Sequence, residues 1–207
     1  MTPPSTFEEI ITLLVAYLCG SIPWGLFISW LFKLQDPRTA GSGNIGATNI
    51  LRLGDKWAAF LTLLLDALKG IFAVLFAIIF CPSLAQLAGL LAIAGHIWPI
   101  WLGFRGGKGV ATAFGVVLVL SWPLALSCLV SWLMIAITSR YSSLASVITV
   151  ALSPLYAFIL TQVDLIVFSL VLALLIIFTH RDNIKRLLTG KESQIGKDSP
   201  SNPTPSE

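Results

Sequence analysis

The chain has 207 residues, of which 56% are hydrophobic and only 11% are charged, and its mean hydropathy is +0.88. This composition excludes a soluble domain of this size, because several apolar runs approach or exceed the roughly 20 residues that a membrane-spanning helix needs. The net charge of +3 comes from Lys and Arg spread over separate loops, so we expect no nucleic-acid partner. Because period-two alternation is absent, we predict an all-α, polytopic membrane helical bundle rather than a barrel.

Seven transmembrane helices are expected in chain order. The first apolar run follows an acidic start and is longer than a signal peptide, so we expect it to remain as a span, kinked at Pro23. The fourth run is about 17 Å long at 1.5 Å per residue and needs a thinned or protein-lined crossing. Pro123 separates it from the fifth, because Pro favours the first turn of a new helix. The expected spans are about Phe7–Phe32, Lys56–Phe80, Leu84–Leu102, Val110–Leu120, Trp122–Thr138, Leu144–Leu160 and Leu165–Thr179.

The distribution of Lys and Arg sets the predicted orientation. With seven spans, loops 33–56, 103–109 and 139–143 share one side with the tail, and that side carries the basic residues, whereas five spans put Arg140 on the wrong side. We therefore predict that the N-terminus is outside and the C-terminus is cytoplasmic. Residues 1–192 are expected to form one transmembrane domain, and residues 193–207 a disordered cytoplasmic tail.

The first polar loop carries AGSGNIGATNILR at residues 40–52. Its glycines permit tight turns that expose backbone N–H groups, and Arg52 offers a fork that suits phosphate. Such a loop can also be a plain linker between helices. As an anion site, its remaining ligands would be Ser42, Gly43, Asn44, Thr48 and Asn49.

The second polar loop, GFRGGKG at residues 103–109, directly precedes an expected helix. Gly106, Gly107 and Gly109 permit a backbone nest, and Lys108 adds a point charge beside the helix N-terminus. The spacing is not that of a nucleotide-binding P-loop. A phosphate-binding loop is therefore predicted, without a nucleotide.

Away from the ends of the expected spans, charge is costly, and three residues there are candidates for a function. Asp66 and Lys69 are three positions apart on one helix face and can form an ion pair, either as structural support or as a substrate contact. His96 lies roughly 9 Å below the cytoplasmic end of its span, as a packing residue or a functional one. We assign all three to substrate binding.

His180 and Asn183 share one face at the cytoplasmic end of the last span, where they could form an interfacial cap or a catalytic pair. The few acids and the three isolated cysteines supply no metal-ligand set, so no metal and no cofactor are expected.

Two phosphate-type loops and a histidine on one membrane face favour substrates that are anionic at one end and apolar at the other. A transporter of organic phosphates would also want such loops, but no internal repeat is visible. A CDP-alcohol phosphotransferase would need a carboxylate-rich metal motif, which these few acids do not supply.

Six motifs together resemble the bacterial acyl-phosphate:glycerol-3-phosphate acyltransferase family. They cover nearly the whole chain up to residue 192, and they are GSIPWG at 20–25, SGNIGATN at 42–49 with Arg52, Asp66 to Gly70, Gly95-His96, GGKGVAT at 106–112 and HRDNIKRLLTGKE at 180–192. The resemblance implies a multi-pass enzyme of the bacterial inner membrane with a cytoplasmic site. It would transfer a fatty acyl group from acyl phosphate to the 1-hydroxyl of glycerol 3-phosphate, giving 1-acylglycerol 3-phosphate and phosphate in the first acylation of phospholipid synthesis.

The resemblance also implies residue roles. Ser42 and Arg52 match an essential pair, the GGKG loop matches a site for the phosphate of glycerol 3-phosphate, and Glu192 matches a structurally important residue. The residues assigned to catalysis are Ser42, Asn44, Arg52, Lys108, His180 and Asn183. Acyl-CoA is not expected as donor, and no obligate protein partner is evident.

The expected mechanism is direct transfer without an acyl-enzyme, since no Cys or Ser–His–Asp set is well placed. Two points stay open from the sequence. Either His180 or a substrate phosphate oxygen takes the proton of the attacking hydroxyl, and Ser42 and Arg52 hold either the acyl phosphate or the glycerol 3-phosphate.

Overall fold

The computed structural model describes residues 4–196, and within that range every regular element is a helix, as predicted. The α-helices are α1 (Thr6–Gly20), α2 (Trp24–Leu31), α3 (Ala47–Arg52), α4 (Lys56–Phe80), α5 (Ala85–Ile97), α6 (Val110–Leu120), α7 (Trp122–Ser139), α8 (Ser142–Ile159), α9 (Asp164–Thr179) and α10 (Arg181–Leu188). Two short 3-10 helices, η1 (Pro82–Leu84) and η2 (Ile100–Leu102), flank α5.

Local sequence signals explain where several helices begin. Ser5 and Glu8 form a capping box at α1, and the Asp55 carboxylate accepts two backbone N–H groups at the start of α4. Ser121 caps α7, with Pro123 in its first turn. The predicted kink in the first span is a break between α1 and α2 at residues 21–23.

Two expected boundaries were wrong. The third helix ends at Ile97 rather than Leu102, because Pro99 has no N–H to continue it, and the chain then turns through η2. The polar tail after His180 begins with a helix, α10, which we did not predict. Ile184, Leu187 and Leu188 recur at helical spacing there, among basic residues.

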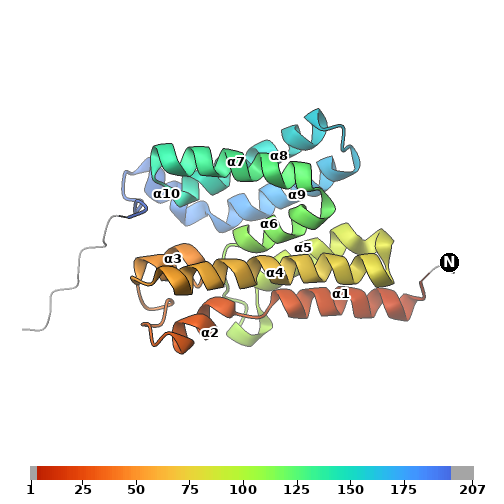
Figure 1. Ribbon diagram of the computed structural model, residues 1–207, viewed down its shortest axis with the longest axis horizontal. Helices are drawn as coiled ribbons and strands as arrows, with labels where there is room; N and C mark the ends of the chain where they lie inside the picture. The colour runs from red at the N-terminus through yellow and green to blue at the C-terminus, as the bar shows by residue number, and fades with distance from the viewer. Residues whose placement is uncertain (1–3, 197–207) are drawn as a thin grey trace, which may run out of the picture.

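The helices run along a common axis in two groups (Figure 1). α1, α4 and α5 pack together on one side, α7, α8 and α9 on the other, and α6 lies between them against α4, α5 and α7. The core is rich in alanine, including Ala73, Ala77, Ala88 and Ala92, which lets the helices approach closely. α3 and α10 both lie at the end away from the N-terminus (Figure 1).

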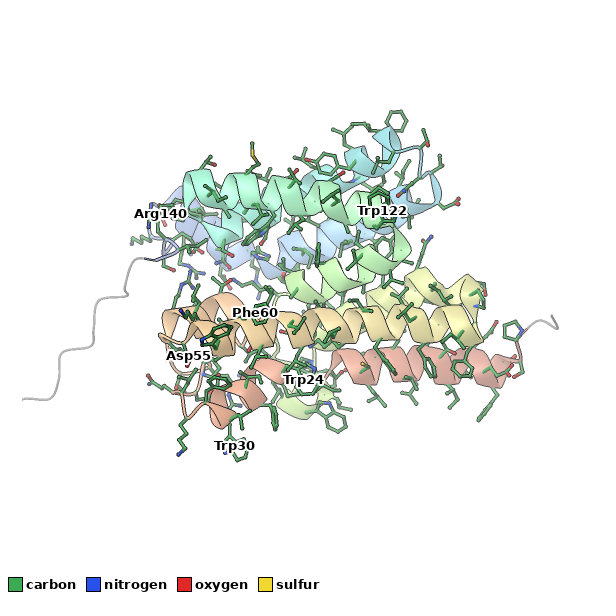
Figure 2. All side chains as sticks on the ribbon, viewed as in Figure 1. Trp24, Trp30, Asp55, Phe60, Trp122 and Arg140 are labelled. Carbon is green, nitrogen blue, oxygen red and sulfur yellow. The ribbon has the colours of Figure 1, made fainter. Side chains whose placement is uncertain are left out.

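The outer surface is apolar, as a lipid-facing surface must be. Ile137 on α7 and Leu174 on α9 are 75% and 71% exposed. Five helical segments are long and apolar enough to cross a membrane, and α9 with α10, bent by 63°, makes a sixth. α6 is shorter. Figure 2 shows Arg140 at the same end as Asp55 and Trp30, opposite Trp122, so the α7–α8 loop lies at the end that carries α3 and α10.

Candidate active site

Asn49 organises the first glycine loop from inside. Its side chain is buried at the start of α3, and its Nδ2 donates to the carbonyls of Pro37, Ala40 and Asn44 at 2.9, 3.0 and 2.8 Å. Its Oδ1 accepts the backbone N–H of Ser42 at 2.7 Å. The amide is therefore fully used within the loop, which makes Asn49 a scaffold for the loop rather than a substrate ligand.

The other loop residues are left on the surface or face the rest of the molecule. Ser42 is exposed, and Asn44 Oδ1 accepts the Gly46 N–H at 2.8 Å. Gly43 has a φ of +72°, which favours glycine. Thr48 Oγ1 lies 3.2 Å from Ser142 Oγ, so the loop contacts the start of α8.

Arg52, the last residue of α3, carries free bonding capacity. One Nη donates to the Ser193 carbonyl at 3.3 Å, whereas the buried Nε has no hydrogen-bond partner among the described residues. Burial lowers the pKa of Arg52; Glu192 opposes this shift and Arg186 adds to it. An unpaired, desolvated guanidinium edge of this kind is ready to receive an anion.

The GGKG loop is fixed on α5 by its backbone. Gly106 N–H donates to the Ile97 carbonyl and Gly107 N–H to the His96 carbonyl, both at 3.0 Å. Gly109, with φ +84°, turns the chain into α6, whose N-terminus has no side-chain cap. The first N–H groups of α6 therefore remain available beside Lys108.

Lys108 joins the GGKG loop to the C-terminal motif. Its Nζ makes a short hydrogen bond to Asn183 Oδ1, and its carbonyl accepts from Thr179 Oγ1 at 3.2 Å. Burial lowers the pKa of Lys108 to about 8; Glu192 opposes the shift, and the cations Arg186 and Arg52 add to it. Lys108 is thus still mainly charged near neutral pH.

His180 lies at the junction of α9 and α10. Its Nδ1 must donate to the Ile176 carbonyl at 2.8 Å, which leaves Nε2 as the acceptor. Burial, with a smaller effect of Lys108, lowers the pKa of His180 to about 4. The imidazole is therefore neutral at physiological pH.

Glu192 ties the C-terminal motif together. Its Oε1 accepts from Asn183 Nδ2 at 2.6 Å and from Ser143 Oγ at 2.7 Å, and its Oε2 accepts from Arg186 Nε at 2.7 Å. Burial alone would raise the pKa of Glu192, but these three hydrogen bonds outweigh it and hold the pKa below its usual value. Glu192 is thus an ionised, saturated acceptor.

The three motifs form one polar site. Arg186 is close enough to lower the pKa of Arg52, both arginines lower the pKa of Lys108, and Glu192 is the main carboxylate among the three cations. Positive charge is in excess, which suits anionic ligands. Within residues 4–196, no three His, Cys, Asp or Glu side chains gather closely enough to hold a metal ion.

Asp66, Lys69 and His96 take no part in these contacts and are buried behind the GGKG loop. Lys69 Nζ is 2.8 Å from Asp66 Oδ1 and donates to the Ile22 carbonyl at 3.0 Å. His96 Nδ1 is 3.4 Å from the same carboxylate oxygen. The ion pair expected from the spacing is present, and its partners are internal.

Sequence reasoning missed Ser142, Ser143 and Arg186. The two serines start α8 and contact Thr48 and Glu192, but loop 139–143 was considered only for topology. Arg186 was not among the expected site residues, although its side chain pairs with Glu192. A serine pair directly after a basic loop was the available signal.

Known proteins resemble this chain over nearly its whole length. The family model described as glycerol-3-phosphate acyltransferase matches residues 10–190. A glycerol-3-phosphate acyltransferase of Jannaschia sp. (strain CCS1) is 52% identical over 91% of this chain and 94% of its own length. One of Mesorhizobium japonicum is 49% identical over 92% and 98%.

Solved structures of PlsY, an integral membrane glycerol 3-phosphate acyltransferase, have the same fold. Its glycerol 3-phosphate form is 41% identical with a TM-score of 0.85, and its lysophosphatidic acid form is 40% identical with a TM-score of 0.83. Both alignments cover 90% of this chain and 95% of PlsY. The chain therefore belongs to the glycerol-3-phosphate acyltransferase family, multi-pass membrane enzymes of phospholipid biosynthesis.

Proposed function

We propose that the protein transfers an acyl group from acyl phosphate to the 1-hydroxyl of glycerol 3-phosphate, giving 1-acylglycerol 3-phosphate and phosphate. The observation that carries this proposal is the excess of partly buried positive charge where three motifs meet, at Arg52, Lys108 and Arg186. The relatedness to PlsY, which was solved with glycerol 3-phosphate and with lysophosphatidic acid, supports the acceptor and the product.

The three cations would reduce the electrostatic repulsion between the two substrates. Two phosphate-bearing substrates repel each other, and holding them together requires neutralisation of their charge. We assign Lys108 and the N-terminus of α6 to the phosphate of glycerol 3-phosphate, and Arg52, with Ser42 beside it, to the acyl phosphate. Positioning of this kind can lower a barrier by several kcal/mol, roughly 7–11 at the limit.

The acyl step needs no covalent intermediate. The acceptor hydroxyl oxygen attacks the acyl carbon, the bond from that carbon to the phosphate oxygen breaks, and phosphate leaves with its electron pair. Asn44 is our donor for the developing oxyanion, because Asn183 already bonds Lys108 and Glu192.

The hydroxyl proton has two candidate acceptors, His180 Nε2 and a phosphate oxygen. A pKa of about 4 makes His180 a weak base. A phosphate monoester has its second pKa near about 6, so a substrate phosphate is the better proton acceptor. We propose that His180 orients the hydroxyl and that phosphate takes the proton.

The proposed arrangement is seven crossings in the bacterial inner membrane, with the N-terminus outside and the site facing the cytoplasm. α6, too short to cross alone, would complete the count by crossing within the bundle between α4 and α7. We also propose one transmembrane domain over residues 1–192. The chain just after it still contacts this domain, since Ile195 N–H donates to the Arg140 carbonyl. The rest of the expected tail lies outside the described residues.

Purified protein in detergent, given acyl phosphate and glycerol 3-phosphate, should form lysophosphatidate, and acyl-CoA should not replace the donor. Vesicle uptake of glycerol 3-phosphate without lysophosphatidate formation would support a transporter instead. A trapped acylated protein in a single turnover would contradict direct transfer.

A further inference from the structure

The charged cluster of Asp66, Lys69 and His96 has no aligned hydrogen bond at Asp66 Oδ1 or at His96 Nδ1, although both atoms are fully buried. The pair of Asp66 and Lys69 at 2.8 Å is therefore held chiefly by charge, and His96 Nδ1 lies 3.4 Å from the same carboxylate oxygen. Each side chain is 4% exposed or less. A substrate could not reach them without opening the helix packing.

The other side of the His96 ring faces the GGKG loop. A Cβ built on Gly107 would overlap His96 Nε2, so the glycine lies directly against the ring. The His96 carbonyl also accepts the Gly107 N–H at 3.0 Å. His96 therefore contacts Gly107 through both its ring and its backbone, and the next residue is Lys108.

The same cluster borders the contact between α4 and α6. Gly70, which follows Lys69, packs so closely on the Thr112 carbonyl that a Cβ would overlap it, and Gly115 packs likewise on the Ala67 carbonyl. The first two turns of α6 are thereby fixed to α4. Lys108 lies between this contact and the His96 contact.

We propose that Asp66, Lys69 and His96 are positioning residues that fix the GGKG loop, and so aim Lys108 at the phosphate of glycerol 3-phosphate. This revises their assignment as substrate-binding residues and rests on the proposed function for the identity of the phosphate. Asp66 holds the ring orientation of His96, Lys69 balances the carboxylate and anchors it to the Ile22 carbonyl, and His96 forms the wall behind Gly107.

Charge is a physically reasonable means of fixing this wall. A well-packed apolar trio would often be as stable as a buried ion pair, so stability alone does not require the charges. An ion pair restricts the His96 ring to one orientation, and active-site groups need placement to within about 0.5 Å.

The test separates the two sides of His96. His96→Asn keeps a polar atom towards Asp66 but removes the ring beyond it, whereas His96→Phe keeps the wall and loses the contact with Asp66. Gly107→Ala is made alone and in both backgrounds. Gly106→Ala is the matched control, because its Cβ would overlap the backbone carbonyl of His96, which no side-chain change removes.

Gly107→Ala alone should raise the KM for glycerol 3-phosphate by about tenfold, with the KM for acyl phosphate nearly unchanged. In the His96→Asn background, Gly107→Ala should raise the KM for glycerol 3-phosphate by less than about twofold. In the His96→Phe background, the increase should again be about tenfold. Gly106→Ala should change the KM for glycerol 3-phosphate by the same factor in every background.

Multiplicative effects of Gly107→Ala and His96→Asn would overturn the proposal, as would equal changes in both KM values. Calorimetric binding of glycerol 3-phosphate to the same variants reports the coupling without an acyl donor. If binding couples but wild-type protein forms no lysophosphatidate, the proposed reaction fails and the positioning role stands.

Discussion

Two groups of charged side chains lie on either side of the GGKG loop, and they differ in balance. Asp66 and Lys69 are enclosed and pair with each other, with His96 beside the same carboxylate. Around Glu192, three cations share one main carboxylate, and Arg52 keeps a buried Nε without a partner in the described chain. On the proposed function, burial of charge alone would not mark a ligand site here, whereas an unmatched charge would.

The largest effect is expected for Glu192→Ala. It removes the main carboxylate beside Arg52, Lys108 and Arg186, the open group, and so increases its excess of positive charge. Ser143 and Asn183 would lose their acceptor and Arg186 its partner, so we expect a loss of about 3 kcal/mol of unfolding free energy. Thermal unfolding in detergent measures it, with Glu9→Ala as the control. An unchanged unfolding temperature would mean that the open group does not depend on its carboxylate.

Arg52→Ala tests whether the unmatched charge binds substrate. It should lower kcat/KM by about 10² to 10³ and act mainly through the KM of acyl phosphate. Arg38→Ala is the control, because Arg38 is exposed and already paired with Asp36. Equal effects on the KM values of both substrates would count against a separate site for each phosphate.

The pH dependence follows from Lys108, whose pKa is lowered from 10.5 to about 8. Above pH 8 the cation is lost, so kcat/KM for glycerol 3-phosphate should fall about tenfold per pH unit. The free energy of unfolding should instead rise with pH between 8 and 10.5, because in that range Lys108 is protonated in the unfolded chain and largely deprotonated in the folded one. Lys108→Arg should remove the fall in a pH–rate profile; its persistence would assign the fall to another group.

The smallest effect is expected for Ser143→Ala. It removes one of three hydrogen bonds to Glu192, and two donors remain, so the expected loss is about 1 kcal/mol. Ser153→Ala serves as the comparison on the same helix, since the buried Ser153 Oγ donates within α8, to the Val150 carbonyl. A loss as large as that of Glu192→Ala would show that the serine holds the group together.

Hydropathy predicted most helices because each span is a local property. α4 and α6 begin and end at the expected residues, and the i, i+3 spacing predicted the pair of Asp66 and Lys69. His96 as their neighbour, and Ser143 as a partner of Glu192, could not be predicted, because those contacts join segments far apart in the chain. α10 was missed because its charges outweigh its three apolar residues in any hydropathy average.

The contact from Arg52 to the Ser193 carbonyl spans 141 positions. On the ribosome, the first glycine loop is therefore synthesised well before α4 to α9. Arg52 cannot form its contact with Ser193 until the chain is nearly complete. A nascent chain that stalls before residue 180 carries both glycine loops and nearly all the apolar helices, yet none of the third motif. Biosynthesis thus delays activity until insertion into the membrane is almost finished.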